Sequence, residues 1–222
     1  VDSDAKYEEI ASDLKKRVEG DIRFDKYSRL LYSTDASMYE IEPIGVVLPH
    51  HKGDVQAVIE VANRFGVPIL SRGGGTSLAG QTVGHAIVVD FSKYMNKVLE
   101  VNTEELWCRV QPGLVQDELN AHVRPMGLLF GPDTSTSNRA TIGGMIGNNS
   151  AGAHSIAYGL TIHHVLELTC YLADGSEVVL TELSPEALRI KTKGNGLEGQ
   201  IYRELLRLVD EHLTSAEADR LL

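Results

Sequence analysis

The segment from Ser71 to Gln81 reads SRGGGTSLAGQ and lies between two apolar runs, Val67–Leu70 and Ala86–Phe91. Short apolar runs bounded by glycine are typical of buried strands. Glycine tolerates positive φ angles, so successive N–H groups in Gly73–Ser77 can turn toward one anion. The segment therefore predicts an anion-binding loop between two strands, in which hydroxyls add donors and Arg72 adds charge or braces the backbone.

Two familiar glycine-rich motifs do not fit this segment. A dinucleotide-binding fingerprint needs glycine at the sixth place from Gly73, where the chain has Leu78, and it needs a helix before the next strand. A P-loop needs a lysine after its second glycine, and no lysine lies between Lys52 and Lys93. The loop is expected to bind its anion mainly through backbone amides.

A second polar, glycine-rich stretch extends from Phe130 to Gly159 and reads FGPDTSTSNRATIGGMIGNNSAGAHSIAYG. Loops of this length inside a domain are usually functional or disordered. A helix is expected to begin at Thr141–Gly144, where free N–H groups would bind phosphate. Each stretch alone could be a simple turn, but two of them suit a ligand with a pyrophosphate and a long body lying between two subdomains.

Hydrophobic periodicity predicts an α+β fold with two small subdomains, each contributing one glycine-rich loop. The expected helices are Ser3–Val18, capped by Ser3 or Asp4 and ended by Gly20; a helix capped by Asp54 and ended by Gly66; Leu114–Met126; Leu197–Leu213; and Ser215–Leu222. The expected strands are Gly45–Pro49, Val67–Leu70, Ala86–Phe91, Val98–Asn102 and Leu106–Gln111, followed by a hairpin of Val165–Leu172 and Glu177–Leu180. The first two strands and the helix between them predict a βαβ element.

Composition narrows the possible partners and location. The chain has 222 residues, 42% of them hydrophobic, and a net charge of −10, which disfavours a nucleic-acid partner. No apolar stretch is long enough to cross a bilayer, and the polar start is unlike a signal peptide, so we expect a cytoplasmic protein that is at most peripheral to a membrane. Cys108 and Cys170 lie in apolar runs and are expected to be buried free thiols.

The eight histidines do not predict a metal site. His50–His51 and His163–His164 are adjacent pairs, and adjacent residues of a strand point to opposite faces. No Cys/His spacing matches a zinc site, so we expect surface or capping histidines. Trp107 is expected to pack in the core.

Taken together in order, PILSRGGGTSLAGQ, GPDTSTSNRATIGGMIGNNSAGAHSIAYG and the preceding Thr34–Tyr39 segment TDASMY resemble a known family. Between about Lys26 and Leu180 the chain resembles the FAD-binding domain of the vanillyl-alcohol oxidase and para-cresol methylhydroxylase flavoproteins. Within that superfamily it is similar to the glycolate oxidase, D-lactate dehydrogenase and D-2-hydroxyglutarate dehydrogenase branch. The resemblance implies a para-cresol-methylhydroxylase-type fold, with a small βαβ-containing subdomain and a mixed or antiparallel sheet subdomain.

The resemblance also implies a domain division. Residues 1–28 would form a helical lead, and residues 29–181 the FAD-binding domain, with subdomains at about 29–95 and 96–181. Residues 182–222 would form a helical extension that stops before the closing strand and the substrate domain of this family. We therefore expect the front portion of a longer enzyme, with its catalytic residues beyond residue 222.

The matching motifs imply which residues hold the cofactor. The implied FAD contacts are Arg72, Gly73, Gly74, Gly75, Thr76, Ser77, Gly80, Gln81, Pro132, Asp133, Thr134, Ser135, Thr141, Gly143, Gly144, Asn149, Ser150, Ala151, Gly152 and Gly159. Some relatives attach FAD through a histidine in the first loop, but this chain has none between His51 and His85, so non-covalent FAD is expected. Attachment through His154 is the less expected alternative. For Tyr158, flavin contact and core packing are both open.

The implied activity is oxidation of a 2-hydroxy acid of the D-lactate, glycolate or D-2-hydroxyglutarate type by hydride transfer to flavin. Electrons would then pass to an iron–sulfur region, a quinone or a carrier. An alternative of another class is a flavin- or nucleotide-binding module without catalysis of its own, serving electron transfer or assembly. Similarity to the flavin-dependent cell-wall reductase of the same fold is weaker.

Overall fold

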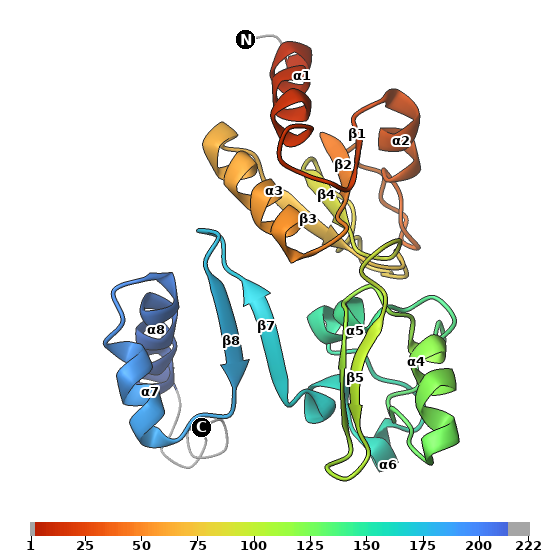
Figure 1. Cartoon of the computed structure of the whole chain (residues 1–222), viewed down its shortest axis with the longest axis vertical. Helices are drawn as coiled ribbons and strands as arrows, with labels where there is room; N and C mark the ends of the chain where they lie inside the picture. Colours follow the sequence, from red (N-terminus) through yellow and green to blue (C-terminus); the bar gives the residue numbers. More distant parts are fainter. Residues whose placement is uncertain (1–2, 213–222) are drawn as a thin grey trace. The chain divides into compact units, whose positions relative to one another are not determined.

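The computed structural model describes residues 3–212, with side chains from residue 5 onward. The chain divides into two compact units between Val165 and Leu166, and each unit is described by itself. The first unit contains both glycine-rich stretches. The second contains the predicted hairpin and the helices that follow it (Figure 1).

A four-stranded sheet organises the first unit. Its strands are β1 (Asp21–Arg23), β2 (Gly45–Leu48), β3 (Ile69–Arg72) and β4 (Ile87–Asp90), in the order β1-β2-β4-β3. The strands β2, β4 and β3 are parallel, and β1 is antiparallel to β2. Since β4 lies between β2 and β3, the expected βαβ crossover through α3 (Lys52–Phe65) passes over one strand. The first glycine-rich loop leaves the carboxyl end of β3, which lies at the edge of the sheet.

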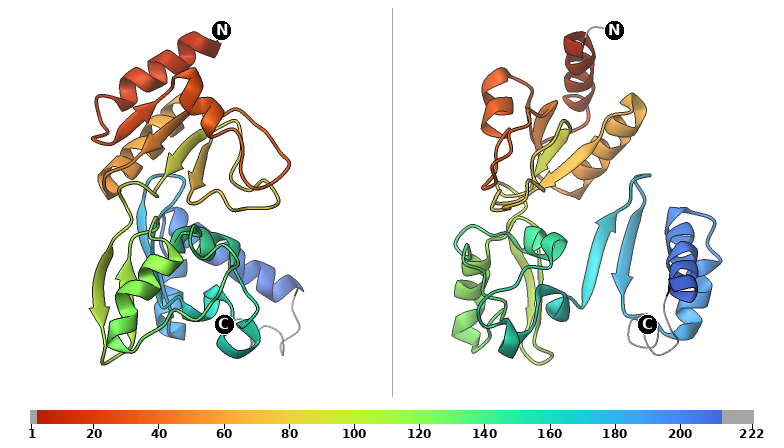
Figure 2. Two further views of the ribbon diagram at one scale, coloured as in Figure 1. Left: turned by 90° about the vertical axis from the view of Figure 1, so that its right-hand side faces the viewer. Right: turned by 180° about the vertical axis from the view of Figure 1, so that it is seen from behind.

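Helices cover both faces of this sheet (Figure 2). Alternate strand residues Val47, Ile87 and Val89 pack against α1 (Ser3–Leu14) and α3. On the other face Val46, Leu48 and Val88 pack against Tyr32, Leu70 and Tyr94, next to α2 (Lys26–Leu31). Burial on both faces explains why these strands are continuously apolar in sequence.

The start of α3 differs from the prediction. His51 is the N-cap, and its Nδ1 accepts the N–H of Asp54 at 3.3 Å. The fully buried carboxylate of Asp54 instead accepts the N–H groups of Glu19, Gly20 and His50 at 2.9, 3.1 and 2.8 Å. Asp54 therefore ties the segment after α1 to the start of α3. Sequence reasoning missed this role because two of its three donors lie 34 and 35 residues away.

The remainder of the first unit forms a second core. Its elements are the antiparallel hairpin of β5 (Val98–Asn102) and β6 (Trp107–Val110), α4 (Gln116–Val123), the 3-10 turn η1 (Arg124–Met126), α5 (Ile142–Asn148), α6 (Ser155–Tyr158) and the 3-10 turn η2 (Thr161–His164). Leu119, Val123 and Met145 are buried here between α4 and α5. The expected single helix Leu114–Met126 is thus an α-helix followed by a 3-10 turn, which contains Pro125.

The second unit consists of a hairpin and two helices: β7 (Glu167–Tyr171), β8 (Glu177–Thr181), α7 (Pro185–Thr192) and α8 (Leu197–His212). The predicted hairpin is confirmed, with Glu167 opposite Thr181 and the turn at Gly175, whose φ is +85°. The expected helix Leu197–Leu213 corresponds to α8. The expected helix Ser215–Leu222 lies outside the described residues.

Other predictions needed small corrections. The helix α1 ends at Leu14: the N–H of Lys15 still bonds four residues back, to Ala11, but those of Lys16 and Arg17 bond only three residues back. The strand β3 begins at Ile69, since the N–H of Val67 bonds back to Ala62 and Pro68 has no N–H to give. The elements β1, α2 and α7 were not predicted; β1 and α2 have only three and six residues, too few for a periodic signal.

Cys108 and Cys170 are free, as predicted, but half-buried rather than buried, and their burial raises the pKa of each thiol. Trp107 is also half-buried, and its indole N–H donates to Glu105 at 2.7 Å. No helix within residues 3–212 has the length and hydrophobicity needed to cross a bilayer.

Candidate nucleotide-binding site

The first glycine-rich loop presents a run of available backbone donors. Within residues 3–212, none of the six consecutive N–H groups from Gly73 to Leu78 donates to a protein acceptor. Gly75 and Gly80 have φ angles of +64° and +77°, which side chains other than glycine rarely adopt. The loop remains irregular over this whole run, so its amides are left for a ligand.

A hydroxyl in the same loop also lacks a partner. Ser77 Oγ is buried and makes no hydrogen bond within the described part of the chain. Leaving a buried polar group unpaired costs about 1–3 kcal/mol, so such groups are normally satisfied. The orphaned hydroxyl beside the free amides indicates that an external oxygen completes this site.

Arg72 braces the loop. Its Nη1 donates to the carbonyl oxygens of Tyr32 and Thr82 at 3.3 and 3.2 Å, and its Nη2 donates to that of Thr34 at 2.8 Å. The guanidinium also lies over the Tyr32 ring, 5.1 Å from its centroid. The hydrogen bonds of the guanidinium therefore go to backbone carbonyls of the protein. This favours a role for Arg72 in bracing the loop over a role in supplying charge to the anion.

The Thr34–Tyr39 segment, TDASMY, packs against the first glycine-rich loop and its flank. The N–H of Ala36 donates to the carbonyl oxygen of Gly75 at 3.0 Å, and Thr82 Oγ1 donates to Asp35 Oδ2 at 2.9 Å. A Cβ on Gly80 would lie 2.6 Å from the Tyr39 ring. These contacts explain in structural terms why the Thr34–Tyr39 segment and the glycine-rich loop occur together in the motifs that resemble the family.

The structure brings the two glycine-rich stretches into direct contact. A Cβ on Gly73 would lie 2.0 Å from Thr141 Oγ1, and one on Gly74 would lie 2.2 Å from the carbonyl oxygen of Arg139. Gln81 Nε2 also donates to Asn148 Oδ1 at 3.4 Å. Only glycine permits this approach, so the two stretches lie directly against each other.

The second stretch does not provide donors where they were predicted. Thr141 caps α5 as expected, and its Oγ1 accepts the N–H of Gly144 at 3.4 Å. The N–H groups of Ile142 and Gly143 donate at 2.8 Å to the carbonyl oxygens of Leu114 and Pro112. The expectation that this helix start offers free N–H groups is therefore wrong, because a neighbouring segment supplies the acceptors.

The Pro132–Ser135 segment is fixed by a buried glutamine that sequence reasoning missed. Gln116 is 2% exposed; its Nε2 donates to the carbonyl oxygen of Pro132, and its Oε1 accepts the hydroxyl proton of Thr134 at 2.7 Å. The signal was present in the sequence, since Gln116 lies on the same helical face as the apolar residues Leu119 and Val123.

The segment after α5 turns sharply and is tied to η2. Asn149 adopts a left-handed conformation with φ +46°, and its Oδ1 accepts the N–H of Ile162 at 3.0 Å. The carbonyl oxygen of Ser150 accepts from both the N–H and the hydroxyl of Thr161. Gly159 ends α6 with φ +83°, and the Tyr158 side chain before it is 51% exposed, so Tyr158 is not a core residue.

Asp133 is in close contact with the Gly152 segment. A Cβ on Gly152 would lie 1.7 Å from the carbonyl oxygen of Asp133. Asp133 Oδ2 and His154 Nδ1 are 2.5 Å apart, and Asp133 Oδ1 accepts the backbone N–H of His154 at 3.1 Å. The hydrogen bonds from His154 keep the pKa of Asp133 below its usual range.

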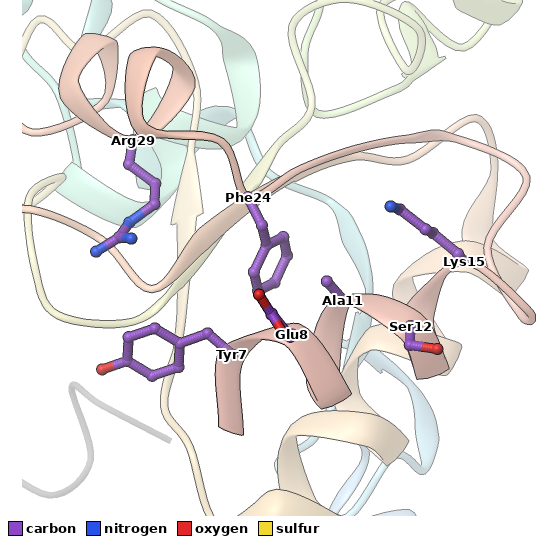
Figure 3. A pocket seen from close by; sticks show the side chains of 7 residues that line it. All are labelled: Tyr7, Glu8, Ala11, Ser12, Lys15, Phe24 and Arg29. Carbon is purple, nitrogen blue, oxygen red and sulfur yellow. The ribbon is translucent and has the colours of Figure 1, made fainter. Parts of the chain in front are cut away.

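A separate hollow lies on α1 and is not part of this site (Figure 3). It is lined by Tyr7, Glu8, Ala11, Ser12, Lys15, Phe24 and Arg29. In it the Arg29 guanidinium pairs with Glu42 at 2.9 Å and lies over the Tyr7 ring. Within residues 3–212, no group of three or more histidine, cysteine or acidic side chains is placed to hold a metal ion.

The donor set of the loop site fits the diphosphate of FAD. Diphosphate oxygens are acceptors, and the site offers the Gly73–Leu78 amides and the Ser77 hydroxyl, which has no partner among residues 3–212. The close approach at Gly73 and Gly74 also leaves no room for a side chain where the two stretches meet. Of these residues, Gly73 to Ser77 are among those for which the family resemblance implied contact with FAD.

Comparison with known proteins finds relatives that match most of this chain. The chain is 41% identical over 197 residues to D-2-hydroxyglutarate dehydrogenase of Pantoea ananatis. The matched region covers 87% of this chain and 19% of that protein. It is 36% identical over 174 residues to glycolate oxidase subunit GlcD of Bacillus subtilis, covering 75% of the chain and 37% of that protein. The chain thus spans about a fifth to about a third of the length of these relatives.

The fold itself matches a solved flavoprotein. p-Cresol methylhydroxylase superposes with a TM-score of 0.66 at 16% identity, covering 79% of this chain and 35% of that one. The predicted α+β fold of para-cresol-methylhydroxylase type is confirmed by this likeness. Residues 43–181 match the FAD binding domain family, and the chain therefore belongs to that family.

Proposed function

We propose that this chain is the FAD-binding part of an oxidoreductase that oxidises a 2-hydroxy acid, of the D-lactate, glycolate or D-2-hydroxyglutarate type. The observation that carries the proposal is the run of amides from Gly73 to Leu78, which, like the neighbouring Ser77 hydroxyl, make no hydrogen bond to any of residues 3–212. The names of the relatives supply the substrate class.

The glycine loop would hold the diphosphate through its amides and Ser77, while Arg72 keeps the loop in shape. The segments Pro132–Ser135 and Asn149–Gly152 would line the remainder of the cofactor. Thr141, Gly143 and Gly144 would form the place where the two stretches lie close together, and they would not donate N–H groups to FAD. When bound, the flavin of FAD supplies hydride acceptance from the hydroxyl-bearing carbon of the substrate.

FAD would be held without a covalent bond, because the glycine loop carries no histidine and His154 is engaged with Asp133. The electron acceptor would be an iron–sulfur region, a quinone or a carrier. The residues that bind the hydroxy acid and take its proton would belong to the larger part of the relatives that this chain does not span.

The test uses the full-length protein that contains this chain. Flavin should co-purify and be released into the supernatant by acid precipitation. Glycolate, D-lactate or D-2-hydroxyglutarate should then reduce a dye acceptor, with L-lactate and L-2-hydroxyglutarate as controls. A flavin-containing protein that oxidises none of these acids would support the alternative of a flavin-binding module without catalysis. A protein that binds no FAD would overturn the proposal.

A further inference from the structure

A buried carboxylate, Asp90, lies at the carboxyl end of β4, next to the strand end from which the first glycine-rich loop leaves. It is 6% exposed, and in the register of the sheet its partner on β3 is Arg72. Asp90 Oδ1 accepts the N–H of Ser92 at 2.8 Å, and Asp90 Oδ2 accepts the hydroxyl proton of Tyr32 at 2.6 Å. Asp90 therefore ties the phenol of Tyr32 to the sheet.

Tyr32 reaches Asp90 from a segment 58 residues earlier in the chain, where it is the C-cap of α2. Its half-buried ring packs against Val46, Leu48 and Val88 of the sheet. Burial, and then the hydrogen bond to Asp90, raise the pKa of the phenol, so the hydroxyl keeps the proton that it donates. Because the hydroxyl is bound and one part of the ring is packed, the ring is held in one orientation.

The Tyr32 ring carries the side chain that braces the loop. The guanidinium carbon of Arg72 lies 5.1 Å from the ring centroid, and planar guanidinium groups commonly stack on aromatic faces. The same guanidinium contacts the loop, since a Cβ on Gly75 would lie 2.7 Å from its Nη2 and 3.3 Å from its Cζ. A series of side-chain contacts therefore leads from Asp90 through Tyr32 and Arg72 to Gly75.

We propose that Tyr32 is a positioning residue of the cofactor site. Anchored by Asp90, its ring holds the Arg72 guanidinium where that group supports the glycine-rich loop in the shape that receives the diphosphate. The inference rests on the proposed function for the identity of the ligand. Its physical basis is preorganisation, because a loop that occupies its binding shape only part of the time binds with an affinity reduced by that fraction.

Tyr94 provides a matched comparison in the same core. It is half-buried like Tyr32, packs against the same three residues of the sheet, and donates its hydroxyl proton to Asp21 at 3.1 Å. A cation also lies over its ring, since Lys93 Nζ is 4.6 Å from the centroid. The hydrogen bond and ring contacts of Tyr94 lead to Asp21, Lys93 and His50, whereas those of Tyr32 lead to the glycine-rich loop.

The experiment titrates the flavin-free, full-length protein with FAD and follows thermal unfolding of the same variants. Tyr32→Phe keeps the ring but removes the bond to Asp90, and it should lower FAD affinity about three- to tenfold. Tyr32→Leu also removes the ring next to Arg72 and should lower the affinity about tenfold or more. Tyr94→Phe should lower the unfolding temperature as Tyr32→Phe does, but should change FAD affinity less than about twofold.

Variants of Arg72 test whether Tyr32 acts through this residue. In an Arg72→Met background the ring has no guanidinium to hold, so Tyr32→Phe should change FAD affinity less than about twofold. Arg72→Gln serves as the background if Arg72→Met does not fold. If Tyr32 contributed only to folding, Tyr32→Phe would have the same effect on FAD affinity with and without Arg72.

The outcomes separate this inference from the proposed function. FAD binding that Tyr32→Phe and Tyr32→Leu leave unchanged, or lower equally with and without Arg72, overturns the positioning role and leaves the FAD assignment intact. The same conclusion follows if Tyr94→Phe lowers the affinity as much as Tyr32→Phe. A protein that binds no FAD overturns both.

Discussion

The contact between Gly73 and Thr141 gives a direct test of how the two glycine-rich stretches form one site. In Gly73→Ala the new methyl group would lie 2.0 Å from Thr141 Oγ1, against the 3.4 Å at which ordinary contacts begin. The two stretches must separate by about 1.4 Å or distort. Overpacking of this kind costs about 1–3 kcal/mol, and if the separation is borne by the loop, FAD affinity falls by about 5-fold to 150-fold.

The clash has a specific remedy in Thr141→Ala, which removes the atom that the methyl group meets. That change alone sacrifices the hydroxyl cap of α5, which costs about 1 kcal/mol of stability. In the double variant the loops can close again, so much of the lost FAD affinity should return. The two substitutions should therefore show a favourable coupling energy of about 1–2 kcal/mol, within the range for residues in direct contact.

The assay is titration of the flavin-free protein with FAD, followed by flavin fluorescence, for the wild type, both single variants and the double variant. Gly84→Ala is the matched control, since it lies in the same unit and its methyl group meets only the end of the Leu70 side chain at 3.4 Å. Additive losses in the double variant would refute the reasoning, because they would mean that the Gly73–Thr141 contact does not set the shape of the site.

Three further predictions follow from single side chains. Ser77→Ala should weaken FAD binding about three- to tenfold while leaving the flavin-free protein as stable or about 1 kcal/mol more stable, because the hydroxyl has no partner in the described part of the protein; thermal unfolding with and without FAD checks this. Arg72→Lys and Arg72→Met should lower FAD affinity and stability to similar extents, since lysine cannot reproduce the fork of bonds to backbone carbonyls; if lysine preserves affinity, Arg72 acts through its charge on the phosphates. Hydrogen bonds from Lys93 and Arg23 lower the pKa of Asp21 to about 2, so its stabilising effect should be complete above about pH 4 and disappear as the pH falls toward 2. Urea unfolding of wild type and Asp21→Asn should converge over that range, and a constant difference down to pH 2 would contradict the assignment.

Local sequence predicted the strands and helices wherever a strong periodic signal was present. Val98–Asn102 and the hairpin of β7 and β8 were found from alternation and turn residues, and Gly66 correctly marked the end of α3. These features depend on neighbours within a few residues, which is the range over which propensity and turn chemistry act. The position of β4 between β2 and β3 is a choice among strand pairings, and local sequence does not encode it.

Sequence also indicated that two glycine-rich stretches form the site, since glycine is required wherever two backbones approach closely. Which amides remain for a ligand was decided only by the tertiary structure. The start of α5 has the local pattern of an anion site, yet the carbonyl oxygens of Pro112 and Leu114 occupy its N–H groups. The amides from Gly73 to Leu78 have no such neighbour among residues 3–212 and stay available. A backbone donor is free only when no acceptor from elsewhere in the chain folds against it, and that is a property of the assembled fold.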